Sequence, residues 1–338
     1  MKIGTDQYNT FDTMTMDCWN DRVYYEGKEF PAGHFAAGIL NFAGVIHDPL
    51  LERITVLTAL VDDLSTAEKS KRHDIAAQLK PLLYDTVSWI YTCPPFCYCE
   101  SQSAYENLEH ALSEERLDQD YEGEETHLPY LALSFCEPIL RILVALYNFC
   151  LLIRTFEMKY LRGSKQRNAD AFAKAAHECF DEDDSFLILL EQMPFGEVEE
   201  FFSYPRVVTG FNYFQDENDE EKWKTAQRVI CKRAIDFYVF DLMNGLHHGH
   251  APSQCQGCGK YFLTTNGHIP KYCDSVAPQD SRYTCRQYGA MMHQKEQNKQ
   301  HPVYRLFNTR TGTIRKHHQR GKISDDLRRE ALYLAGSY

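Results

Sequence analysis

Four cysteines near the C-terminal end of this chain have the spacing of metal ligands. Cys255 and Cys258 form a C-x2-C pair, and Cys273 and Cys285 complete the pattern C-x2-C-x14-C-x11-C. Such a pair followed by glycine brings two sulfurs to one side of a tight turn, about 2.3 Å from a shared zinc ion. Because four thiolates leave no open coordination position, the pattern predicts one structural Zn²⁺ ion and no catalytic metal.

Two further groups of donor residues lie outside this pattern. One precedes the first cysteine pair and consists of His247, His248 and His250. We interpret it as a solvated or phosphate-facing linker that supplies a ligand only if a cysteine does not bind. The other contains three thiols, which could share a metal or sense oxidants: Cys93, Cys97 and Cys99. We favour packed thiols around a Pro-Pro turn.

Charge is divided unevenly along the 338 residues. The whole chain has 36 Lys+Arg and 48 Asp+Glu, a net charge of −12. Residues 246–338 hold 14 of the cations and 6 of the acids, a net of +8, which leaves 22 and 42, a net of −20, for residues 1–245. The division predicts an acidic domain of unknown function over 1–245 and a zinc-finger and basic helical domain over 246–338.

A cluster of cations follows the cysteines and has the composition of a phosphate-binding surface. We predict nucleic-acid contacts from Arg286, Arg305, Arg310, Arg315, Lys316, Arg320 and Lys322. DNA is the favoured partner over RNA. The alternative is an interaction protein with a purely structural zinc finger, whose basic tail binds the acidic domain or a partner protein.

The segments around the cysteines resemble a known zinc finger. They read C-x-x-C-G-K-Y-F from Cys255, K-Y-C-D at 271–274 and Y-T-C-R at 283–286. Over about 250–335 the chain resembles bacterial CGNR-type zinc-finger proteins, in particular uncharacterised bacterial proteins with a Y-C-D/T-C-R variant finger. In place of the Gly-Asn-Arg that follows the last cysteine in that family, this chain has Arg286-Gln287-Tyr288-Gly289. The resemblance implies a basic helix after the finger and no known activity for the N-terminal part.

The sequence offers little support for catalysis. It has no P-loop, no G-x-S-x-G and no G-x-G-x-x-G motif. A metal-dependent nuclease built on the finger, with Asn308, His317 and His318 as its polar groups, is the remaining enzymatic hypothesis. We therefore expect no catalytic residues and a regulatory, nucleic-acid-binding role.

The compartment expected is the bacterial cytoplasm. Twelve cysteines in 338 residues are too dilute for a disulfide scaffold, and residues 1–8 lack the apolar run of a signal peptide. The longest apolar stretch, 130–153, is interrupted by Glu137, Pro138 and Arg141. It predicts a buried core helix and no membrane partner.

Periodicity predicts a mainly α-helical fold in which a helical N-terminal body with a small β element precedes the finger and its basic helices. We expect a hairpin turning near Gly27, and a strand pair within 197–214. Helices are expected over 50–64, 68–80, 82–91, 139–158, 169–193, 220–245, 286–300 and 303–314, with a last one from Ser324.

Overall fold

The computed structural model describes residues 13–42, 48–118, 130–184, 207–216, 219–265 and 271–336. Within them the chain is mainly helical, as predicted, with a small amount of sheet. It divides into two compact units: unit 1 comprises Met1–Gln254 and Lys260–Pro270, and unit 2 comprises Cys255–Gly259 and Lys271–Tyr338. The division predicted from charge differs from this one in that residues 246–254 and 260–270 belong to unit 1.

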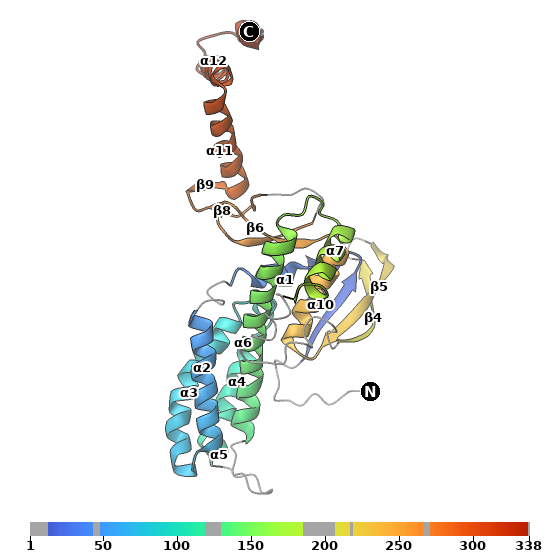
Figure 1. Ribbon diagram of the computed structural model, residues 1–338, viewed down its shortest axis with the longest axis vertical. Coiled ribbons are helices and arrows are strands. Elements are labelled where there is room, and N and C mark those ends of the chain that lie inside the picture. Colours follow the sequence, from blue (N-terminus) through green and yellow to red (C-terminus); the bar gives the residue numbers. More distant parts are fainter. Residues whose placement is uncertain are drawn as a thin grey trace. The chain divides into compact units, whose positions relative to one another are not determined.

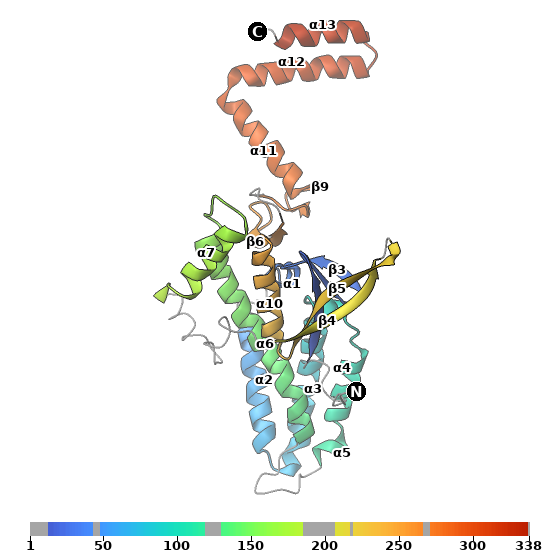
Figure 2. The same cartoon turned by 90° about the vertical axis from the view of Figure 1, so that its right-hand side faces the viewer.

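Unit 1 contains a group of helices that lie side by side (Figures 1 and 2). They are α2 (Asp48–Thr66), α3 (Lys69–Ile90), α4 (Gln102–Ala111), the short α5 (Glu114–Leu117) and α6 (Tyr130–Phe156). Inside the group lie apolar side chains that include Ile54, Leu79, Leu143 and Leu146, each fully buried. The apolar stretch Phe135–Leu161 is long enough to cross a membrane, but 61% of an 18-residue apolar window within it is buried inside the structure, as expected of a core helix.

One helix is longer than we predicted. The sequence indicated separate helices over 68–80 and 82–91, whereas α3 runs through Pro81 without a break. An internal proline removes one backbone hydrogen bond and costs about 3 kcal/mol. Leu79 and Leu83, on either side of Pro81, are both buried, so packing of the same helical face before and after the proline offsets that cost.

A five-stranded antiparallel sheet lies beside the helices of unit 1. Its strands are β1 (Met14–Trp19), β2 (Arg22–Tyr25), β3 (Lys28–Pro31), β4 (Val207–Asp216) and β5 (Asp219–Cys231), in the order β3-β2-β1-β5-β4. The predicted hairpin is confirmed. Glu26 and Gly27 form its turn with φ of 48° and 70°, as a tight two-residue turn requires.

The second hairpin was mispredicted in part. We expected two strands within 197–214 and a helix from 220 to 245; the structure has strands over β4 and β5, and a helix only from Ala234. Residues 197–206 lie outside the described part. The helical prediction for 220–231 was wrong because β5 pairs with β1, more than 200 residues away in sequence, as well as with β4, and such long-range pairing is invisible to local periodicity.

Helices α1 (His34–Ile39) and α10 (Ala234–His247) are joined by a buried carboxylate. The oxygens of Asp241 accept hydrogen bonds from the backbone N–H groups of Gly33 and Ala36, each at 2.9 Å. A Cβ added to Gly245 would lie 2.8 Å from Gly33 Cα, so only glycine allows this close approach. Gly245, predicted as a helix stop, is therefore an internal contact point, and α10 continues to His247.

Unit 1 also includes the short hairpin of β6 (Ala251–Gln254) and β7 (Tyr261–Thr264), and the helix α7 (Ala169–Phe180). The predicted helix over 169–193 is confirmed as far as Phe180, and residues 185–193 lie outside the described part.

Together with the turn at Cys255–Gly259, the described part of unit 2 contains two strands and three helices. They are β8 (Val276–Ala277), β9 (Asp280–Thr284), α11 (Cys285–Gln300), α12 (Pro302–Gln319) and α13 (Asp325–Gly336), which confirms the three predicted C-terminal helices. The buried residues among those described in unit 2 are Cys255, Cys273, Ala277, Cys285, Gly289 and Thr311. The unit thus has no buried Leu, Ile, Val or Phe in its described residues, and lacks an ordinary hydrophobic core there.

Candidate metal centre and its basic helices

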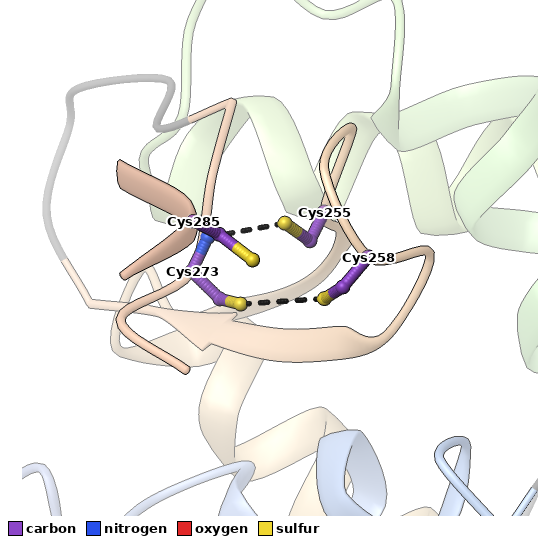
Figure 3. Close-up of side chains that lie close together, drawn as sticks. All are labelled: Cys255, Cys258, Cys273 and Cys285. Atoms are coloured by element: carbon purple, nitrogen blue, oxygen red, sulfur yellow. Dashed lines mark hydrogen bonds between the residues drawn. The ribbon is translucent and has the colours of Figure 1, made fainter. Parts of the chain in front are cut away.

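The four predicted ligands converge in unit 2. Cys255 and Cys258 lie in the turn after β6, Cys273 lies before β8, and Cys285 is the first residue of α11 (Figure 3). The four sulfurs all lie within 4.8 Å of one another, and the sulfurs of Cys258 and Cys273 are 3.6 Å apart. Sulfurs about 2.3 Å from a tetrahedral metal are about 3.8 Å apart. The cluster could therefore hold a metal ion.

Backbone N–H groups favour the thiolate form of Cys255, the first of the four cysteines. Its sulfur accepts hydrogen bonds from the N–H groups of Gly257 and Cys273, each at 3.3 Å. Gly259, with φ of 73°, donates its N–H to the Cys255 carbonyl at 2.9 Å and closes the turn. Burial acts to raise the pKa of Cys255, but N–H donation from Cys273, Cys258 and Gly257 outweighs it and lowers the pKa to about 7.

The last cysteine is fixed by the start of α11. Thr284 caps this helix through a reciprocal pair of hydrogen bonds with Gln287, at 3.2 and 3.0 Å. Sequence reasoning missed this capping box, although T-x-x-Q at 284–287 is its usual signature. Burial, followed by the nearby sulfurs of Cys258, Cys273 and Cys255, raises the pKa of Cys285. Four thiols this close cannot all ionise unless a cation neutralises them, which suits a metal ion to the site.

Beside the four cysteines, the ring of Tyr272 packs between two glycines. It approaches Gly257 in the cysteine turn and Gly289 on α11, so the ring links the turn to the helix. A Cβ at Gly289 would lie 2.4 Å from Tyr272 Cε2. Nothing in the sequence indicates this contact, because Gly289 stands there only as one of the residues that replace the Gly-Asn-Arg of CGNR-type fingers.

Replacing Gly289 with alanine is expected to destabilise the folded metal-bound unit by about 1–3 kcal/mol, because the ring must move away from the helix. The same substitution at Gly312 in α12, where an added Cβ meets nothing within 4 Å, is expected to be neutral or stabilising by up to about 1 kcal/mol. Resistance of the bound metal to a chelator, measured for both variants, checks this. Equal metal retention by the two would contradict the role of Tyr272.

The other candidate donors do not join this centre. Within the part of the chain that the structure describes, the four cysteines are the only group of His, Cys, Asp or Glu whose ligand atoms converge. His250 is buried, with Nδ1 2.9 Å from the Ala32 carbonyl. Cys93 is buried, which raises the pKa of its thiol to about 12, and Cys99 Sγ lies 3.1 Å from the Tyr25 hydroxyl. None of the twelve cysteines forms a disulfide.

The nuclease hypothesis gains no support from the polar residues of α12. Asn308 donates to the Asn298 side chain at 2.9 Å, and His318 lies 3.2 Å from Asp325. These are contacts with α11 and with the start of α13. With His317 they form no convergent group in the described residues.

All seven predicted nucleic-acid contacts are exposed. Arg286 lies 3.0 Å from Asp274, and the other six make no ion pair within the described residues; they are Arg305, Arg310, Arg315, Lys316, Arg320 and Lys322. Arg305, Arg310 and Arg315 are spaced by five residues, which turns each about 140° from the previous one. They are therefore spread around α12, and the densest group of cations is at its C-terminal end and in the following turn.

Comparison with known proteins shows that one segment is similar to a family of unknown function, and it gives no activity. Residues 203–338 match the model of a family of unknown function, DUF6076. No curated protein and no solved structure matches the chain. The matched segment includes β4, β5, α10, the four cysteines and the basic helices, so the part similar to that family contains the whole candidate metal centre.

Proposed function

We propose that unit 2 binds one structural zinc ion and that its basic helices bind nucleic acid, with DNA preferred over RNA, as part of a regulatory protein of the bacterial cytoplasm. The observation that carries the proposal is the direct continuation from the last cysteine, Cys285, into α11 and then into the cation-rich α12. A closed set of four thiolates suits a structural zinc ion, and reduced thiols fit a reducing compartment. The resemblance to CGNR-type fingers, which covers about 250–335, agrees with a zinc finger followed by a basic helix.

The cations best placed to contact phosphates are those concentrated at the end of α12. Arg315, Lys316, Arg320 and Lys322 are all exposed, and exposed lysine and arginine side chains bind phosphates without first having to break strong ion pairs. Unit 2 holds 13 Lys+Arg and 6 Asp+Glu, a net charge of +7, which gives it the electrostatics that the whole-chain charge of −12 conceals.

The test is binding of the full chain to duplex DNA by fluorescence anisotropy at 50 and 200 mM salt. Replacing Arg315, Lys316, Arg320 and Lys322 by glutamine is expected to weaken binding at least tenfold and to lower the salt slope by about 0.9 for each phosphate that the variant no longer neutralises. The matched control removes four exposed cations of unit 1, Lys69, Lys71, Lys165 and Lys232, and is expected to retain the slope. No binding to DNA or RNA at 50 mM salt, or equal weakening in both variants, would contradict the proposal.

An interaction protein is the second candidate, and a separate observation favours it. Unit 2 exposes large apolar side chains, among them Val303 at 72%, Leu306 at 52% and Leu327 at 50%. Such residues are common at protein interfaces. If the chain acts as an interaction protein, a partner protein is expected to co-purify with it and to stay bound at high salt.

A further inference from the structure

One side of α11 is exposed and, apart from one alanine, polar. Successive helical residues turn by about 100°, so Ala290, His293, Gln294 and Gln297 share a side of the helix. All four are exposed. No carboxylate lies among them, because the single acid of α11, Glu296, lies outside this set and is 3.3 Å from Lys299.

Two contacts, one near each end of α11, fix the direction of this polar side. At the N-terminal end the helix starts at the cysteine centre, and Gly289 is covered by the ring of Tyr272. At the C-terminal end Asn298 accepts a hydrogen bond from Asn308 of α12. Figure 2 shows α11 extended between these two attachments, with α12 and α13 beyond its C-terminal end. A helix held at both ends presents its side chains in a fixed orientation.

The chemistry of the polar side matches the edges of base pairs. A glutamine carboxamide can accept a hydrogen bond from the adenine N6 amino group and at the same time donate one to adenine N7. The major groove is about 12 Å wide, which admits a helix of about 10–12 Å diameter. A protein partner would instead need large apolar or aromatic anchors, and Ala290 is the single apolar residue of the set.

We propose that α11 reads DNA sequence by lying in the major groove, with Gln294 and Gln297 contacting adenines of neighbouring base pairs. The inference rests on the proposed nucleic-acid binding and names double-stranded DNA as the partner. Cations at the end of α12 contact the phosphates and carry no sequence information. Sequence preference and salt-dependent affinity therefore reside in different helices.

The test uses the full-length chain. A preferred duplex is first selected from a pool of random 20-base-pair duplexes, and binding to it and to a scrambled duplex is then compared at one salt concentration. Gln294→Ala and Gln297→Ala are each expected to reduce the preference by roughly tenfold to hundredfold, while affinity for the scrambled duplex is unchanged. The control, Met292→Ala, changes a residue 45% exposed on the other side of α11 and is expected to keep the preference.

The outcomes separate this inference from the proposed function. Binding of wild-type chain to all duplexes with equal affinity, or equal weakening for preferred and scrambled duplexes in both glutamine variants, overturns the role of α11 and leaves nucleic-acid binding intact. Binding to single-stranded RNA alone also overturns it. Absence of binding to any nucleic acid defeats both. Alanine favours helix, and equal metal content of all variants shows that unit 2 is folded.

Discussion

Cys273→Ser is expected to release the metal and unfold unit 2 while unit 1 stays folded. The described part of unit 2 buries no large apolar side chain, and three of its six buried residues are the predicted ligands Cys255, Cys273 and Cys285. A structural zinc ion supplies on the order of 10 kcal/mol, whereas helices of about 12–18 residues are marginal in water on their own. We expect about one zinc per wild-type chain and much less in the variant, measured by elemental analysis.

Two readouts separate the units in this experiment. The three tryptophans, Trp19, Trp89 and Trp223, all lie in unit 1, so the fluorescence-detected unfolding of unit 1 is expected to be unchanged. Amide hydrogen exchange over 285–300 is expected to rise by orders of magnitude, because α11 loses its anchor. Cys97→Ser, at an exposed cysteine of unit 1, is the matched control. Full protection of α11 in Cys273→Ser would show that the centre does not hold unit 2 together.

Asp241→Ala is expected to destabilise unit 1 by about 3 kcal/mol or more. The carboxylate is fully buried and accepts hydrogen bonds from Gly33 and Ala36, and the N–H of Phe35 also lowers its pKa. Alanine leaves these buried N–H groups without an acceptor, at about 1–3 kcal/mol each. Urea unfolding followed by tryptophan fluorescence measures the loss. Asp74→Ala, at an exposed position in α3, is expected to change stability by less than about 0.5 kcal/mol.

The contribution of Asp241 to the free energy of unfolding is also expected to depend on pH. Burial raises its pKa to about 6 from the ordinary 3.8, despite the N–H donors. A carboxyl whose pKa is raised in the folded state contributes stability below its unfolded pKa, and that contribution is lost as the pH rises through 6. The difference in unfolding free energy between wild type and Asp241→Ala should therefore shrink by about 1 kcal/mol from pH 5 to 7.5. A constant difference would contradict the raised pKa.

The candidate metal centre was predictable because its signal is local. A C-x-x-C pair followed by glycine specifies its own turn, and Gly259 does adopt the positive φ that this turn needs. The later ligands, Cys273 and Cys285, were found by residue type and spacing alone. What spacing did not show is the support of the centre: the cap by Thr284 and Gln287, and the Tyr272 ring against Gly289.

The fold was predictable where the residues of a single helix or hairpin are enough to specify its structure. The hairpin at Gly27 and the helices of unit 2 followed from turn chemistry and periodicity. The prediction failed for β5, whose residues 220–231 have a helical composition but pair with β1 and β4, and for α3, where buried neighbours keep Pro81 inside a helix.

The sequence by itself determined the spacing of the four candidate ligands, the mainly helical class and the opposite charges of the two parts of the chain, because each is a property of residue type and short-range spacing. Only the tertiary structure decided that Asp241 of α10 caps α1, that α11 starts at the metal centre with its polar side exposed, and that unit 2 has no large buried apolar side chain in its described part. These features depend on which distant segments come together, and burial and long-range pairing are set by the whole chain.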